Sequence, residues 1–324
     1  AGASSDGERR SDDCRWIFQV LTGQPIRMAF SLDRIRHLYD FSSNFLDVNG
    51  QQMHYLDEGA GDPVVMLHGN PTWSFMYRKL VHLLSPRFRV LAPDHIGCGL
   101  SSKPPDSEYD YLLSQRILDL ETFLDRLDVR KEITLVVHDW GGIIGMGYAT
   151  RYPERIKRVV VFNTAAFLPQ GKSIHWSLRY CRKSQLAAAL IRGFNAFAGI
   201  ASMTGCRQHP MNRELRRAYT GPYDSWRNRI ATLRFVQDIP LDSRDPSFAI
   251  IDEIERRLTL LEDKPMLICW GMKDFVFDED FLREWIRRFP KAETHRFANA
   301  GHYVVEDSFG EIGLLVKEFL ERPV

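Results

Sequence analysis

The stretch VVHDWGGIIG, from Val136 to Gly145, joins a run of β-branched residues to an apolar helix through paired glycines. Small residues at Gly141 and Gly142 allow a tight strand-to-helix turn that projects one side chain above a sheet. Here that side chain is Asp139. A carboxylate at a helix N-terminus is kept ionised by free backbone N–H groups and by the helix dipole, so it needs no base before it attacks carbon. The alternative interpretation is a structural N-cap, which is a common role for Asp.

Continuous apolar or β-branched runs on both sides of this turn are typical of strands that are buried on both faces of a parallel sheet. They predict strands at 63–69, 88–94, 133–139, 158–163, 265–271 and 294–299. Helix-period stretches lie between them, for example at 112–129 and 309–322. Two alternating segments within 45–59 are joined by Asn49-Gly50, a dipeptide that favours a hairpin turn. The alternation predicts an α/β fold with a mostly parallel central sheet flanked by helices.

One long interval breaks this alternation. Residues 164–249 carry no strand pattern but contain two helical stretches with interleaved aromatic residues, at 177–203 and 223–240. A long helical excursion between two strands is usually a lid over a binding site. We therefore expect a core of residues 31–163 and 250–324, with a helical cap domain at 164–249. Residues 1–30 are small, charged or turn-forming, and they predict a disordered tail.

Composition excludes several classes of function. The formal net charge of the 324-residue chain is +1, so nothing indicates electrostatic capture of nucleic acid or of an acidic membrane. No apolar run reaches the ~18 residues of a membrane span. The five cysteines are odd in number and form no CxxC pair, which favours reduced, buried thiols and a cytoplasmic location.

Two further residues follow predicted strands and complete a catalytic set with Asp139. His302 lies in NAGHYVVED after the last strand, and Asp274 directly follows the strand PMLICWG. The carboxyl ends of parallel strands gather at one edge of a sheet, where Asp274 could accept a hydrogen bond from the imidazole and orient it. Three other carboxylates compete for that role but look like the start of the next helix: Asp278, Glu279 and Asp280.

Two neutral donors accompany the nucleophile candidate. Asn70, in LHGNPTWS after the second core strand, carries an amide, and Trp140 carries an indole N–H with no acceptor. Each has an ordinary structural interpretation, as a turn residue and as a packed aromatic. Together they suit a weakly hydrated anion that leaves a carbon atom. A His-Gly motif in this place can also supply a backbone N–H to an oxyanion hole.

Five motifs in combination resemble the haloalkane dehalogenases of the α/β-hydrolase superfamily, and the resemblance extends over nearly all residues beyond 40. The motifs are HGNPTWS (68–74), PDHIGCGLSSKP (93–104), HDWGG (138–142), GMKDF (271–275) and AGHYVVED (300–307). The resemblance implies that Asp139 is the nucleophile, that Asn70 and Trp140 bind halide, and that their backbone amides form the oxyanion hole. One branch of that family takes its acid from a Glu after an earlier strand. The corresponding segment here reads FNTAAF and contains no Glu, so the resemblance implies that Asp274 is the acid.

The implied reaction is hydrolysis of a carbon–halogen bond. Asp139 attacks the halogen-bearing carbon to give an alkyl ester, and His302, oriented by Asp274, activates a water that releases the alcohol. The expected partners are a small apolar substrate, a halide ion and water, with no metal or organic cofactor. Members of the similar third subfamily are associated with large assemblies, so a homo-oligomer is possible. We expect no membrane span and no nucleic-acid partner.

Other activities are also compatible with these motifs. The β-lactone decarboxylases of bacterial olefin biosynthesis are similar to the third dehalogenase subfamily. The segments YDSWRNRIATLRFVQDIPL and CWGMKDFVFD look like those that both share. The motifs do not separate these two activities.

Epoxide hydrolases share HDWGG but use two cap tyrosines, for which Tyr180, Tyr219 and Tyr223 are candidates. Fluoroacetate dehalogenases place an Arg where Trp140 stands, and a non-catalytic binding protein would not need all three of the residues Asp139, Asp274 and His302.

Aromatic and apolar cap residues are candidates for the walls of the site, namely Phe167, Trp176, Phe194, Phe197, Met203 and Trp226. The PDHIGCGLS segment has a structural interpretation, with Asp94 and the glycines positioning a loop.

Overall fold

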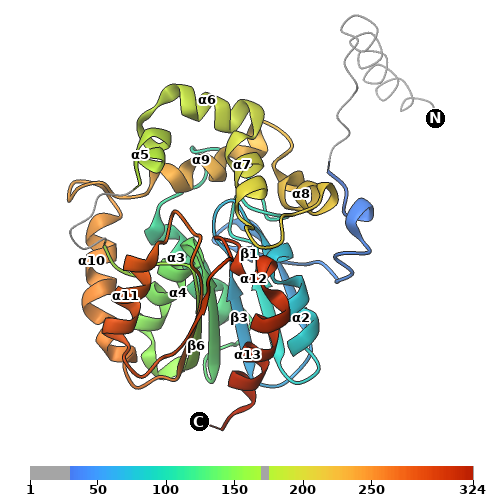
Figure 1. Ribbon diagram of the computed structural model, residues 1–324. Helices are drawn as coiled ribbons and strands as arrows, with labels where there is room; N and C mark the ends of the chain where they lie inside the picture. The colour runs from blue at the N-terminus through green and yellow to red at the C-terminus, as the bar shows by residue number, and fades with distance from the viewer. Residues whose placement is uncertain (1–29, 169–174, 324) are drawn as a thin grey trace, which may run out of the picture. The chain divides into compact units, whose positions relative to one another are not determined.

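The computed structural model describes residues 30–168 and 175–323, and the elements below belong to one compact unit that begins at Leu32. The tail predicted for residues 1–30 lies outside the described residues, apart from Phe30. An eight-stranded sheet in the order β1-β2-β4-β3-β5-β6-β7-β8 forms the centre (Figure 1). Its strands are β1 (Asn44–Val48), β2 (Gln51–Glu58), β3 (Pro63–Leu67), β4 (Arg89–Pro93), β5 (Ile133–His138), β6 (Ile156–Phe162), β7 (Met266–Gly271) and β8 (Glu293–Phe297).

The predicted mostly parallel sheet is confirmed. Strands β4, β3, β5, β6, β7 and β8 run parallel, whereas β1 and β2 form an antiparallel hairpin whose second strand pairs with β4. Asn49 and Gly50 form the hairpin turn with φ of 53° and 82°, as the dipeptide predicts. Every residue of β5 and β7 is buried, which explains why these strands read as continuous apolar runs.

Helices cover both faces of the sheet. On one face α3 (Leu113–Arg126), α4 (Trp140–Arg151) and α10 (Phe248–Arg257) pack together, and α11 (Glu279–Arg288) contributes Trp285 to the same core. On the other face α2 (Arg78–Leu84) packs against α13 (Phe309–Glu321), with the short α12 (Val304–Asp307) beside them (Figure 1).

Between β6 and β7 the described residues form helices and no strand. The helices are α5 (Trp176–Lys183), α6 (Gln185–Phe194), α7 (Ala196–Thr204), α8 (Arg213–Thr220) and α9 (Ile230–Gln237), followed by α10. In Figure 1 helices α5, α6 and α7 lie over the carboxyl ends of the strands. We propose that residues 164–249 act as the cap domain.

The helical stretch predicted over 177–203 is broken in two places. The side chain of Ser184 accepts a hydrogen bond from the Ala187 N–H and begins α6, and Asn195 ends α6 in the left-handed conformation with φ of 56°. No single described helix is long and apolar enough to cross a bilayer, but α6 and α7, bent by 78°, together meet that test of length and composition.

Candidate active site

The turn after β5 has the strained geometry that the paired glycines predict. Asp139 adopts φ 50° and ψ −128° between β5 and α4. A Cβ at Gly69 would lie 2.0 Å from Asp139 Oδ1, and one at Gly141 would lie 2.0 Å from the Leu67 carbonyl oxygen. Only residues without a side chain let these backbones approach so closely, which holds the carboxylate above the sheet.

The Asp139 carboxylate is buried and lies against two backbone amides. Its Oδ1 accepts a hydrogen bond from the Asn70 N–H at 2.6 Å, and the Trp140 N–H also donates to the carboxylate. Burial raises the pKa of Asp139, although His302 and the two amides act in the opposite direction. The two amides that sequence reasoning assigned to an oxyanion hole therefore converge on this carboxyl group.

His302 lies between two carboxylates. Its Nδ1–H donates to Asp274 Oδ2 at 2.7 Å, and its Nε2 lies 3.7 Å from Asp139 Oδ2. Burial alone would lower the pKa of His302, but the charge of Asp274, its hydrogen bond and the charge of Asp139 raise it overall. The other oxygen of Asp274 accepts from the Val276 N–H at 2.7 Å, which holds this carboxylate in place.

The competing carboxylate at Asp278 has a different role. It is the N-cap of α11, where its side chain accepts from the Asp280 N–H. The preference for Asp274 over the start of the following helix therefore agrees with the geometry. Asn163, in the place where one dehalogenase branch carries its acid, instead exchanges two hydrogen bonds with the backbone of Gly271 and ties β6 to β7.

The two predicted anion donors lie on the wall of one cavity, but they differ in whether their side-chain N–H groups already have hydrogen-bond partners. The Asn70 side-chain amide donates to the Thr232 carbonyl oxygen at 3.1 Å, which leaves one amide hydrogen uncommitted. Among the described residues none accepts a hydrogen bond from the Trp140 indole N–H, and its ring packs against Phe235 with centroids 5.2 Å apart. The indole is thus the better placed of the two donors.

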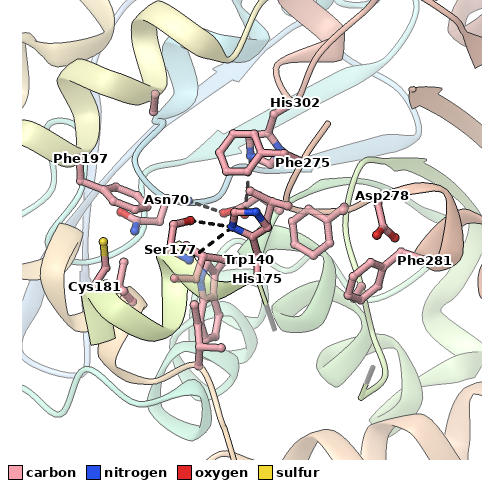
Figure 2. Close-up of a pocket in the computed structure, with 18 of the residues that line it drawn as sticks. Asn70, Trp140, His175, Ser177, Cys181, Phe197, Phe275, Asp278, Phe281 and His302 are labelled. Carbon is pink, nitrogen blue, oxygen red and sulfur yellow. Dashed lines mark hydrogen bonds and ion pairs between the residues drawn. The ribbon is translucent and has the colours of Figure 1, made fainter. Parts of the chain in front are cut away.

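The cavity has a volume of about 640 Å³, and Asp139, His302, Asn70 and Trp140 all line it. Most of its other walls are apolar side chains from α5 to α7 and from the loop after β7, and Figure 2 shows several of them around His302 and Trp140. Mostly apolar walls with a few polar groups are typical of a site for an apolar ligand, and such walls limit the water that reaches a buried carboxylate.

Of the six residues expected to form these walls, only Phe167 and Phe197 do so. The other four candidates do not line the cavity, and they are 55–78% exposed: Trp176, Phe194, Met203 and Trp226. The helices that carry Phe194 and Met203 have few polar side chains, so the pattern alone does not say which side faces the cavity.

The tyrosine pair that an epoxide hydrolase needs is not assembled in the described cavity. Buried Tyr219 donates to Glu306 Oε2 at 2.9 Å, and buried Tyr223 donates to the Thr72 carbonyl oxygen at 2.9 Å. Of the three candidates only Tyr180 lines the cavity. The structural role predicted for Asp94 is confirmed, since its buried carboxylate accepts from the N–H groups of Ser74 and Leu100.

Sequence reasoning missed two supports for the histidine. Buried Asp307, the last residue of the AGHYVVED motif, accepts backbone N–H groups from Gly301 and from the loop after α7, which comprises Arg207, Gln208 and His209. The His138 Nε2–H donates to the His302 carbonyl oxygen at 2.8 Å. These contacts hold the turn that presents the imidazole and connect it to the cap helices.

Replacing Asp307 with asparagine should lower the free energy of unfolding by roughly 2–4 kcal/mol, because an amide cannot satisfy several buried N–H donors as a carboxylate does. Urea denaturation measures the change. A matched control is Asp263→Asn, since this aspartate is exposed and its one ion-pair partner among the described residues is the exposed Lys291. We expect a change within about 0.5 kcal/mol there, and equal losses in the two variants would contradict the anchoring role.

Comparisons with known proteins agree with this architecture. A family model described as the alpha/beta hydrolase fold matches residues 62–309. The chain is 53% identical over 284 residues to the cis-3-alkyl-4-alkyloxetan-2-one decarboxylase of Shewanella oneidensis, covering 87% of this chain and 89% of that protein. It is 45% identical over 293 residues to the decarboxylase of the same name from Xanthomonas campestris pv. campestris, covering 88% and 97%.

Haloalkane dehalogenases are more distant in sequence but match the structure. Haloalkane dehalogenase 2 of Mycobacterium tuberculosis is 30% identical over 285 residues, covering 87% of this chain and 96% of that protein. The crystal structure of the haloalkane dehalogenase DatA from Agrobacterium tumefaciens C58 superimposes with a TM-score of 0.76 at 26% identity, covering 86% and 96%.

Proposed function

The chain belongs to the alpha/beta hydrolase fold family, and we propose that it converts cis-3,4-dialkyl β-lactones to cis-alkenes and carbon dioxide. The observation that carries the proposal is the 53% identity, over most of both chains, to a protein named for loss of carbon dioxide from this ring. Proteins named as dehalogenases are about 30% identical. The order of preference reached from the motifs is therefore reversed, and the decarboxylase takes precedence over the dehalogenase.

The first step uses the carboxylate oxygen that the Asn70 amide does not hold. Asp139 Oδ2 attacks C4 of the lactone ring, the C4–O bond breaks, and its electron pair goes to the ring oxygen. The product is an alkyl ester of Asp139 whose C3 carries a carboxylate. The Trp140 indole N–H and the uncommitted Asn70 hydrogen lie on the wall of the same cavity and stabilise that developing charge as they would a halide.

The second step needs no water and no base. The bond between C3 and the carboxylate breaks, its electron pair forms the C3=C4 double bond, and the ester oxygen leaves C4 to restore the Asp139 carboxylate. Attack inverts C4, and an anti elimination then removes the two groups from opposite sides. A cis-lactone therefore gives a cis-alkene. The apolar cavity favours this outcome, since water would divert the ester to a hydroxy acid.

The test offers the purified protein a cis-3,4-dialkyl β-lactone, its trans isomer and a panel of bromoalkanes. We expect the cis-lactone to yield cis-alkene and carbon dioxide in equal amounts, measured by gas chromatography with mass spectrometry, with little β-hydroxy acid. Bromide release, measured by ion chromatography, should be slower than alkene formation. Rapid bromide release with no alkene would establish the second candidate, a haloalkane dehalogenase, which the indole and amide donors and the DatA superposition also support.

A further inference from the structure

The outer surface of the cap is unusually apolar. Six large side chains on or beside α5, α6, α7 and α9 are between 54% and 78% exposed: Trp176, Leu186, Phe194, Ile200, Met203 and Trp226. We call this set the cap surface. Helices α5 to α7 form the outermost layer above the sheet in Figure 1. Gathered exposed apolar side chains of this kind mark an interaction site.

Helix α6 shows why this surface is not an ordinary solvated one. Ala187 and Ile191 are buried, while Leu186, Leu190 and Phe194 are exposed. A surface helix of a water-soluble protein normally places polar residues on the outer side. Helix α6 has only Gln185 and an arginine among its ten residues as polar side chains.

The cavity opens on the same surface. Tyr180, Leu190 and Ile200 line the cavity and are at the same time 42–54% exposed, so they form its rim. A lactone with two alkyl arms partitions into a bilayer in preference to water. An opening on an apolar surface would let such a molecule enter without crossing water.

The positive charge of the cap favours an anionic partner. The sequence from 164 to 213 contains seven Lys and Arg residues and no Asp or Glu. Arg179, Lys183 and Arg227 are exposed, and no described residue forms an ion pair with them. The net charge of +1 averages this basic region with the rest of the chain, so the sequence-based exclusion of an acidic membrane does not hold for the cap.

The acidic side chains nearest the rim do not counter this charge. Of those that line the cavity, Asp280 pairs with Arg283 at 2.8 Å, Glu284 pairs with Arg287 at 2.6 Å, and Asp278 caps α11. The two ion pairs neutralise most of the acidic charge at this edge.

We propose that the cap surface docks on lipid bilayers that contain anionic phospholipid, with its apolar side chains in the headgroup region. The bend of 78° between α6 and α7 suits helices that lie in the plane of a membrane surface rather than a straight span. The inference goes beyond the proposed reaction, and vesicle binding can be measured without any substrate. A protein that binds vesicles but leaves the lactone intact would overturn only the proposed reaction.

The test is flotation of the full chain with vesicles of phosphatidylcholine and phosphatidylglycerol, beside vesicles of phosphatidylcholine alone. The double variant Leu186→Gln, Phe194→Gln should weaken binding about 10- to 100-fold, because two apolar side chains no longer enter the lipid. Lys183→Gln with Arg227→Gln should weaken binding only to the anionic vesicles, by roughly 10-fold or more, and added salt should do the same.

Leu314→Gln is the matched control, because this leucine is 61% exposed and belongs to α13, which packs against α2 and is not part of the cap surface. It should bind vesicles like the parent chain. The proposal is overturned if the parent chain does not float, or if the control and the cap variant bind equally. It is also overturned if the cap variant dissociates an oligomer, seen by analytical ultracentrifugation, in a chain that never floats. In that case the cap surface is an interface between copies of this chain.

Discussion

Asp139→Asn lowers the rate of alkene formation from a cis-β-lactone by about 10⁴- to 10⁶-fold, the loss expected when the nucleophile of a covalent mechanism is removed. The amide keeps the size of the carboxylate and the contact with the Asn70 N–H, but it cannot attack C4 of the ring. Gas chromatography of the alkene after long incubation at high enzyme concentration measures a loss of this size.

The fold should survive this substitution. Burial raises the pKa of Asp139, which means that burying its charge costs free energy in the folded state. Removing that charge should leave the melting temperature unchanged or raise it. Asp119→Asn is a matched control, since burial also raises the pKa of Asp119 but this residue contacts Tyr109 and Asn49 away from the cavity. Turnover should persist in the control, and turnover above 1% in Asp139→Asn would rule out attack by this carboxylate.

Much of the fold and of the candidate catalytic group could be predicted from the sequence, because each residue of that group lies in the loop that begins where a strand ends. Asp139 follows β5 and Asp274 follows β7, and both strands are fully buried apolar runs that are easy to recognise. His302 comes shortly after β8. Parallel strands bring their carboxyl ends to one edge, so three positions far apart in sequence become neighbours in space.

The contacts that support this group could not be predicted, since they depend on segments whose relative placement no local pattern specifies. The Asn70 amide bonds a carbonyl 162 residues away, and Asp307 collects N–H groups from a loop about 100 residues earlier. The prediction of which cap side chains face the cavity failed for a different reason. A helix such as α6, with only two polar side chains among ten residues, gives little indication of which side meets solvent.

The choice between a lactone and a haloalkane is also not encoded in the residues that react. Either substrate needs a carboxylate nucleophile, and either releases an anion that Trp140 can stabilise. The difference lies in the second step, where a haloalkane ester needs water and a lactone ester does not. His302 is the residue that would activate that water, so its removal should separate the two reactions.

His302→Gln should raise the ratio of alkene formation to hydrolysis by about 10²- to 10⁴-fold, which is the usual contribution of a general base. Hydrolysis here means alcohol from a bromoalkane and β-hydroxy acid from the lactone, both of which require a deprotonated water. Glutamine keeps a hydrogen-bonding side chain beside Asp274 but cannot remove a proton. Product ratios by mass spectrometry measure the effect, and a melting curve checks that the buried site still folds.

The covalent intermediate provides a second, independent test of the His302→Gln variant. With a bromoalkane, the first step proceeds and the second does not, so intact-protein mass spectrometry should find one alkyl group added and one bromide released per chain. With the lactone no adduct should accumulate, because the electron pair from the C3–carboxylate bond expels Asp139 without help from the imidazole. An adduct of the whole lactone mass that persists in His302→Gln would show that the second step needs a base after all, and the elimination derived above would then be wrong.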